Sequence, residues 1–295
     1  MVINDFVNPN LQSGISNINI IKWNSGEFHH ENDKVAMEEP LEIVAKYQLG
    51  KNTIHKPISV TMRTPGDDYS LIIGFLYNEG LITSLRDVID IEFRYTCDGE
   101  AQDQQTAIVS LSESVIPRIT SLERHFYTNS SCGVCGKTAI DLAMQHIAYV
   151  PKSLDGCLTS DQITIAPEIL KTHQKLFHET GGIHASGIFD LNMKLIHFAE
   201  DVGRHNAMDK LSGWCIQNNI LPASDHVLVF SGRTSFELIQ KAMSIGFPIV
   251  LSVGAPSHLA MELARLNGMS LIGFIKSNSF NIYSGLHRIS KNKIH

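Results

Sequence analysis

The chain has 295 residues, of which 43% are apolar and 18% charged, with a net charge of −6 and a pI near 6.1. This balance supports a buried core and excludes a disordered chain, and it argues against broad binding to nucleic acid or to a membrane surface. The first residues show no secretory pattern, and no stretch has the roughly 18 apolar residues of a spanning helix. We therefore expect a cytoplasmic protein with a local basic site for any anionic ligand.

The N-terminal part of the chain predicts a tail followed by a small domain. Residues 1–36 are rich in asparagine and weakly periodic, which indicates a loose tail with a first strand. Residues 37–125 predict a small α/β roll, in which Asp67 or Asp68 caps a helix. The strands of this roll are expected at residues 41–47, 58–62, 88–95 and 106–111.

The rest of the chain, residues 126–295, predicts a second, layered α/β domain because strand and helix patterns alternate in it. Its clearest strands are expected at residues 227–230, 249–253 and 269–275. The two helices between them are short, and Thr234 and Glu237 have the spacing of a capping box for the first. Short helical crossovers between buried strands indicate a partly parallel sheet with right-handed connections.

Ligands of such a sheet bind beyond the carboxyl ends of its strands, where three loops are expected here. Two of these loops lead into helix N-termini, whose free N–H groups attract phosphate, and Arg233 and Lys276 add positive charge. The candidate binding residues in the three loops are Ser231, Gly232, Arg233, Gly254, Phe274, Ile275, Lys276, Ser277, Asn278 and Ser279. Ordinary strand-to-helix turns have a similar composition, so phosphate binding and a purely structural role remain equally open.

The pair Cys132 and Cys135 is the sharpest local feature of the sequence. The two residues lie in a loop rich in glycine and serine, before a predicted helix and beside Lys137. A helix N-terminus and a nearby lysine lower the pKa of a thiol, which favours nucleophilic chemistry. Structural zinc would need further ligands and a thioredoxin-like motif would follow a strand, whereas a sulfur carrier benefits from an exposed loop.

Two further motifs have both a structural and a functional interpretation. Residues 180–187 predict a turn and a strand that place His184 near a cleft, although a single histidine is more often structural. Residues 200–206 place a carboxylate, Arg204 and His205 at the start of a helix. Such a cluster orients a ligand or shuttles protons, or it is a capped helix start with a salt bridge, which the sequence alone slightly favours.

These motifs together resemble those of the formate dehydrogenase accessory sulfurtransferases, the FdhD/NarQ family. The resemblance runs from about residue 38 to the C-terminus. The segments that carry it are 38–41, 61–66, 131–137, 181–186, 200–209, 231–235, 254–257, 273–276 and 280–281. It implies a homodimer with a cytidine-deaminase-like second domain. Deaminase chemistry is not expected, because Ser131 rather than proline precedes Cys132 and the H-x-E pattern at 29–31 lies in the predicted tail.

The resemblance also implies a reaction. Cys132 would take persulfide sulfur from a cysteine desulfurase, with Cys135 assisting or protecting it. The acceptor would be the molybdenum (or tungsten) bis(molybdopterin guanine dinucleotide) cofactor of formate dehydrogenase, bound as a substrate at residues 274–279, with no metal held by the protein itself. His184, Asp201, Arg204 and His205 would shape that pocket. Family members often have arginine in this segment, where Lys276 supplies charge without a bidentate fork. The alternative is a non-catalytic chaperone that binds and escorts the cofactor.

Overall fold

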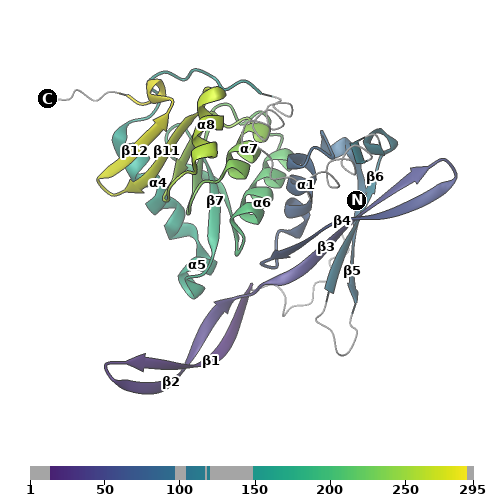
Figure 1. Cartoon of the computed structure of the whole chain (residues 1–295), viewed down its shortest axis with the longest axis horizontal. Helices are drawn as coiled ribbons and strands as arrows, with labels where there is room; N and C mark the ends of the chain where they lie inside the picture. Colours follow the sequence, from purple (N-terminus) through teal and green to yellow (C-terminus); the bar gives the residue numbers. More distant parts are fainter. Residues whose placement is uncertain (1–13, 97–103, 117, 120–148, 291–295) are drawn as a thin grey trace.

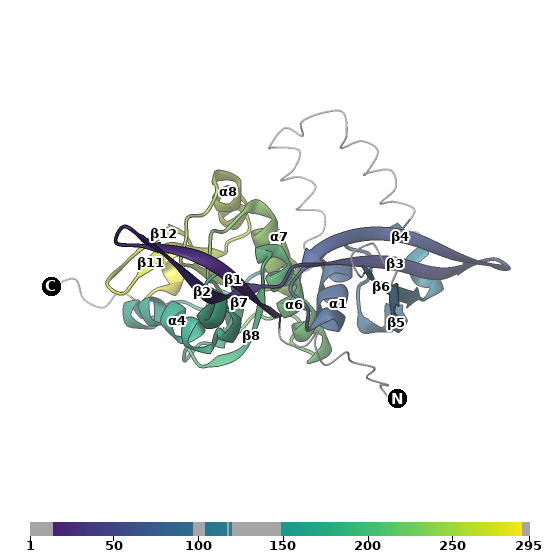
Figure 2. The same cartoon turned by 90° about the horizontal axis from the view of Figure 1, so that it is seen from below.

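The computed structural model describes residues 14–96, 104–116, 118–119 and 149–290 (Figure 1). Cys132 and Cys135 lie outside the described residues. The described part contains a four-stranded sheet, a six-stranded sheet and a projecting two-stranded hairpin (Figures 1 and 2). Within these ranges, the helices all fall short of the length and apolar character that crossing a membrane requires.

The four-stranded sheet forms where the small α/β roll was predicted. Its strands are β3 (Glu39–Leu49), β4 (Asn52–Arg63), β5 (Val88–Thr96) and β6 (Gln104–Leu111), in the order β4-β3-β6-β5. Helix α1 (Asp68–Asn78) follows β4, and the short 3₁₀ helices η1 (Leu85–Asp87) and η2 (Glu113–Val115) flank the last two strands. Strands β3 and β6 run parallel, and the other two pairs are antiparallel. All four strands predicted in this region are present.

The six-stranded sheet is the centre of the second half of the chain. Its strands are β7 (His184–Asp190), β8 (Leu195–Asp201), β9 (His226–Phe230), β10 (Ile249–Ser252), β11 (Ser270–Lys276) and β12 (Ser279–Ser284). Their order is β12-β11-β10-β9-β7-β8, and β9, β10 and β11 run parallel. The predicted mixed α/β class with a partly parallel sheet is therefore confirmed. The cytidine-deaminase likeness and the domain boundaries remain predictions.

Helices cover both faces of this sheet, which explains its almost uninterrupted apolar strands. The helices are α4 (Ser160–His173), α5 (Lys175–Thr180), α6 (Arg204–Gln217), α7 (Phe236–Ile245) and α8 (His258–Leu266), followed by the short η3 (Leu286–Arg288). On one face Leu170 of α4 packs with Val229 and Leu251. On the other face α6, α7 and α8 pack against alternate residues of the same strands, such as Leu228 and Val250 (Figure 1).

A close helix crossing joins the two sheets. A Cβ atom on Gly74 of α1 would lie 1.9 Å from the carbonyl oxygen of Asp209 in α6. A Cβ atom on Gly213 of α6 would likewise lie 1.9 Å from the carbonyl oxygen of Ser70 in α1. Only glycine permits this approach. Because the two helices touch through their backbones, apolar residues of both sheets belong to one continuous core.

For residues 1–36 we expected a loose tail with a first strand, whereas residues 15–36 form a hairpin of two strands. Strands β1 (Ile15–Asn24) and β2 (Glu27–Ala36) pair antiparallel along their whole length. Ser25 and Gly26 both have positive φ angles, 52° and 99°, which suits a two-residue hairpin turn. The second strand was hidden because the hairpin projects from the body and its side chains are mostly exposed (Figure 1). Residues 29–34 of β2 are all polar, so this strand shows no apolar–polar alternation.

Candidate anion-binding site

The three loops that follow β9, β10 and β11 lie side by side and are joined by backbone hydrogen bonds. Gly254 N–H donates to the carbonyl of Gly232 (3.0 Å), and Phe274 N–H donates to the carbonyl of Gly254 (3.1 Å). Gly254 has no room for a side chain, because a Cβ atom there would lie 2.8 Å from the backbone nitrogen of Arg233. The predicted loop cluster at the carboxyl ends of the parallel strands is therefore present.

His184, Arg204 and Arg233 come together beside this cluster. His184 begins β7, and a Cβ atom on Gly232 would lie 3.0 Å from its Nδ1 atom. Burial lowers the pKa of His184, and the positive charges of Arg204 and Arg233 lower it further, against the opposing effect of Asp201. Among the residues that the structure describes, neither guanidinium forms an ion pair or a hydrogen bond. A neutral histidine between two unpaired arginines is an arrangement that favours an anion.

The motif at residues 200–206 does contain a salt bridge, but Arg204 has no part in it. Asp201 is fully buried, and its Oδ2 atom lies 2.8 Å from the Nζ atom of Lys210. The same carboxylate accepts hydrogen bonds from the backbone N–H groups of Thr64 (3.1 Å) and Gly203 (2.9 Å). Asp201 is therefore structural, and its pairing with Lys210 leaves Arg204 available for a ligand.

The N-terminus of α7 opens onto the first loop, and the capping box predicted there is wrong. Ser235 occupies the N-cap position, and no described side chain there bonds the first turn. Glu237 instead lies 3.1 Å from the Nε2 atom of His205. Thr234 is 1% exposed, and its hydroxyl has no hydrogen-bond partner among the described residues. The free N–H groups and the helix dipole thus add to the positive character of the loop.

The predicted binding residues differ in what their side chains can reach. The Ser231 hydroxyl accepts a hydrogen bond from the backbone of Ala185 (2.8 Å), so it ties β9 to β7. Ile275 is 4% exposed and belongs to the core, so its side chain is not available to a ligand. Phe274, in contrast, is 45% exposed and has a φ of 53°, a conformation that costs energy in any residue with a Cβ atom. Strained residues of this kind cluster at binding sites.

Residues 276–279 form the turn between β11 and β12. Lys276 pairs with Ser279 across this turn, and Lys276, Ser277, Asn278 and Ser279 are all exposed. No hydrogen bond or ion pair among the described residues joins these side chains to His184, Arg204 or Arg233. Phe274 therefore belongs to the loop cluster through its backbone hydrogen bond. The ammonium group of Lys276 is exposed and forms no described contact with the two arginines.

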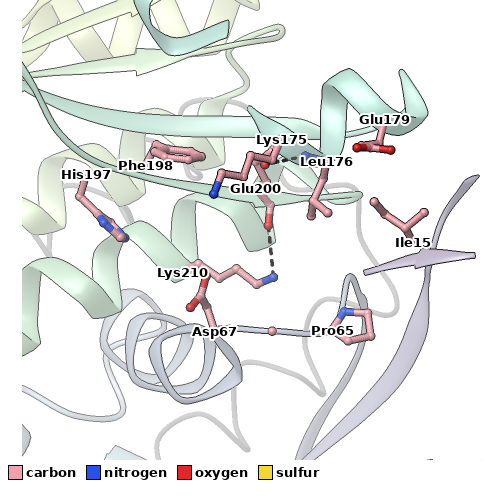
Figure 3. Close-up of a pocket in the computed structure, with 11 residues that line it drawn as sticks. Ile15, Pro65, Asp67, Lys175, Leu176, Glu179, His197, Phe198, Glu200 and Lys210 are labelled. Carbon is pink, nitrogen blue, oxygen red and sulfur yellow. Dashed lines mark hydrogen bonds between the residues drawn. The ribbon is translucent and has the colours of Figure 1, made fainter. Parts of the chain in front are cut away.

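A separate hollow of about 520 Å³ lies along the outer edge of β8, and none of the predicted site residues lines it (Figure 3). Several of its charged groups have partners within the described structure. Lys210 pairs with Asp201, and both oxygens of Glu200 accept backbone N–H groups at the start of α5. Burial raises the pKa of Glu200. We interpret this hollow as part of the junction between the sheets, since its lining comes from the hairpin, the turn at 65–67, α5, β8 and α6.

Comparison with known proteins decides the family. The sequence model of the FdhD/NarQ family matches residues 36–290. The chain belongs to the FdhD/NarQ family. The resemblance that the motifs indicated is thus confirmed, and it extends over both sheets.

Relatives in this family are similar along nearly their full length. The chain is 40% identical over 277 residues to the sulfur carrier protein FdhD of Streptomyces coelicolor, which covers 92% of this chain and 94% of the relative. It is 36% identical over 276 residues to the protein of the same name from Saccharolobus solfataricus, which covers 93% and 98%. A crystal structure from Desulfotalea psychrophila, described as a formate dehydrogenase accessory protein, superposes with a TM-score of 0.67 at 21% identity and covers 93% of this chain and 99% of that one. That structure supports the fold.

Sequence reasoning missed the contacts of Thr234 and Ser235, which follow the first loop of the cluster. Both residues were placed at a helix start, but nothing local indicated that one hydroxyl would lack a partner and that the other would contact His205. The signal that pointed there was indirect: His205 stands next to Arg204 in a family motif.

Proposed function

We propose that this FdhD/NarQ protein is a sulfurtransferase that serves formate dehydrogenase. The thiolate of Cys132 attacks the outer sulfur of a cysteine desulfurase persulfide. A new S–S bond forms on Cys132, the donor's S–S bond breaks, and the donor cysteine leaves as a thiolate. The persulfide would then pass its terminal sulfur to the molybdenum bis(molybdopterin guanine dinucleotide) cofactor, its acceptor substrate, before that cofactor enters formate dehydrogenase. In this step the S–S bond on Cys132 breaks, Cys132 leaves as a thiolate, and two electrons from the reduced metal or from a cellular thiol bring the transferred sulfur to the sulfide level. Cys135 assists or protects the persulfide.

The family comparison supports the sulfur-carrying half of this proposal. Relatives with 36% to 40% identity over nearly the whole chain have the name sulfur carrier protein FdhD. The structure from Desulfotalea psychrophila is described as a formate dehydrogenase accessory protein. The sequence supplies the nucleophile, because Cys132 and Cys135 lie in a glycine-rich loop beside a lysine.

The proposal that the protein binds the cofactor rests on one observation: Arg204 and Arg233 have no ion-pair partner among the described residues. Two guanidinium groups without carboxylate partners in the described structure lie next to a histidine whose pKa they lower. Guanidinium groups and a free helix N-terminus are the groups that bind diphosphates. The exposed ring of Phe274, held beside Gly254, offers a stacking surface for a purine base. Together they fit a guanosine diphosphate unit, which the cofactor contains twice.

Intact-mass analysis tests the sulfur step. The protein is incubated with a cysteine desulfurase and cysteine, and the modified peptide is mapped. We expect an added mass of one sulfur on the peptide that contains Cys132, and its absence in Cys132→Ala. If Cys132→Ala matures formate dehydrogenase as well as the natural protein does, the chain is a non-catalytic chaperone of the cofactor. Zinc bound by the cysteine pair without a sulfur adduct contradicts the transfer of sulfur by Cys132.

Binding of guanosine diphosphate tests the cofactor site. We expect Arg233→Ala and Arg204→Ala each to weaken binding by roughly tenfold, since a charge-assisted hydrogen bond contributes about 1.5–3 kcal/mol. Arg94→Ala is the matched control, because Arg94 pairs with Glu92 on the exposed face of the four-stranded sheet. Unchanged affinity in both arginine variants places the nucleotide elsewhere. Guanosine without phosphates separates loss of the anion contact from loss of base stacking.

The proposed partners follow from the same reaction. The cysteine desulfurase is the donor and formate dehydrogenase is the final recipient, and we propose a homodimer as the working form. Light scattering of the purified protein measures the mass directly, and a value near 32.7 kDa contradicts the dimer.

A further inference from the structure

We infer that His205 is a positioning residue that keeps the N-terminus of α7 open for the phosphate groups of the ligand, by holding the Ser235 hydroxyl away from the helix. The inference rests on the proposed function, because it concerns the same loop cluster. It goes further in assigning a task to a residue pair that does not itself contact the ligand.

The contacts of His205 define the arrangement. Its Nε2 atom lies 3.1 Å from the Oγ atom of Ser235 and 3.1 Å from the Oε2 atom of Glu237. The same ring nitrogen thus forms a hydrogen bond with the Ser235 hydroxyl and lies in close contact with the Glu237 carboxylate. His205 belongs to the first turn of α6, which is packed against α7. The imidazole therefore fixes the side chain of Ser235 from a neighbouring helix.

The neighbouring helix shows what Ser235 would do without this contact. Ser257 occupies the N-cap position of α8 with φ −77° and ψ 162°, and its hydroxyl accepts a hydrogen bond from Ala260 N–H (3.2 Å). Ser235 has nearly the same backbone, with φ −88° and ψ 169°, yet its side chain makes no cap hydrogen bond. Serine at this position normally caps the helix. The difference between the two helices is the histidine that holds the Ser235 hydroxyl.

Two features beside the N-terminus of α7 support a ligand at this place. The Thr234 hydroxyl directly before Ser235 is 1% exposed and has no partner among the described residues, which is costly unless a bound group satisfies it. Arg233 precedes it, and neither this arginine nor Arg204 has an ion-pair partner in the described structure. A serine cap on α7 would occupy an N–H group that an anion can use here.

Two single variants and their combination test the inference, with the affinity for guanosine diphosphate as the readout. In His205→Ala the Ser235 hydroxyl is free to cap α7, and we expect binding to weaken by roughly fivefold. In Ser235→Ala no cap can form, so binding stays within about twofold of the natural protein. In the double variant His205→Ala/Ser235→Ala the helix end is open again, and we expect the affinity to be restored. His205→Gln, whose amide can still donate to Ser235, retains binding.

The outcomes separate the inference from the proposed function. Absence of guanosine diphosphate binding in the natural protein overturns both. Normal binding in His205→Ala overturns the role of His205 and leaves the proposed function intact. Equal weakening in His205→Ala and in the double variant also overturns it, because the loss then comes from altered packing or from the unpaired carboxylate of Glu237. His55→Ala, which removes an exposed histidine of β4, is the control and is expected to bind normally.

Discussion

The carboxylate of Asp201 and the ammonium group of Lys210 lie 2.8 Å apart, and both side chains are buried, with 0% and 2% exposure. Lys210 also donates to the carbonyl of Thr64 (2.8 Å), whose N–H donates to Asp201 (3.1 Å). This pair therefore fastens the end of β4 to the end of β8. Asp201 is satisfied by Lys210 and by backbone groups, and within the described part of the chain the adjacent Arg204 forms no ion pair.

Lys210→Met is expected to lower the free energy of unfolding by about 3–5 kcal/mol, because it leaves the Asp201 charge buried without a counter-ion. Adding Asp201→Asn removes that charge and should recover a large part of the loss. Urea denaturation measures both. Lys22→Met is the control, since its pair with Glu31 is exposed on the hairpin and should contribute little. A loss in Lys210→Met as small as in Lys22→Met contradicts a structural role of the buried pair.

Gly213→Ala is expected to destabilise the protein by about 3 kcal/mol or more, because the new methyl group overlaps the Ser70 carbonyl and forces α1 and α6 apart. Helix propensity alone favours alanine over glycine by about 1 kcal/mol, so the sign of the change is diagnostic. Thermal unfolding measures it. Gly182→Ala is the control, because the added Cβ would lie 3.9 Å from the carbonyl oxygen of Thr180 and the residue has no positive φ. A stabilised Gly213→Ala protein would falsify the close crossing.

Phe274→Gly separates stability from binding. Glycine adopts a φ of 53° without the cost of about 1–2 kcal/mol that a side chain incurs, and the ring is 45% exposed, so we expect unchanged or higher stability. The same change removes the stacking surface and should weaken binding of guanosine diphosphate. Calorimetric titration and thermal unfolding on one preparation measure both. Unaltered binding would show that the strained phenylalanine does not serve the ligand.

The histidines predict how stability depends on pH. Burial lowers the pKa of the half-buried His184, His197, His205 and His226. Because the unfolded chain binds these protons near pH 6.5 and the folded chain only at lower pH, stability is complete above about pH 6.5 and is lost as the pH falls. His197 stacks on Trp214 with ring centroids 4.2 Å apart. His197→Phe keeps the stack without titrating, so its urea midpoint should fall less between pH 7 and pH 5.

Phe198→Leu serves as the control for this comparison, because it alters the neighbouring residue of β8 without removing a titrating group. Its midpoint should follow the slope of the natural protein. An identical slope in His197→Phe means that His197 takes up no proton on unfolding in this range.

Local patterns along the sequence were sufficient for the class of fold and for most of the elements. Strands β9, β10 and β11 could be predicted, because each is a run of adjacent apolar residues followed by a glycine-containing loop. Only one strand of the hairpin β1–β2 was expected, because β2 contains a run of polar residues at 29–34 and lacks alternation. The capping box expected from Thr234 and Glu237 failed for a related reason: a residue of another helix, His205, takes both Ser235 and Glu237 as partners.

By itself the sequence determined the family, the cysteine pair and the identity of the loops, since motifs are properties of adjacent residues. The tertiary structure decided which charges remain free. Asp201 meets Thr64, 137 residues away, and is bound to Lys210, and among the residues that the structure covers Arg204 has no carboxylate partner. Ion pairs in a folded protein are chosen by distance and burial, and neither can be read from spacing along the chain.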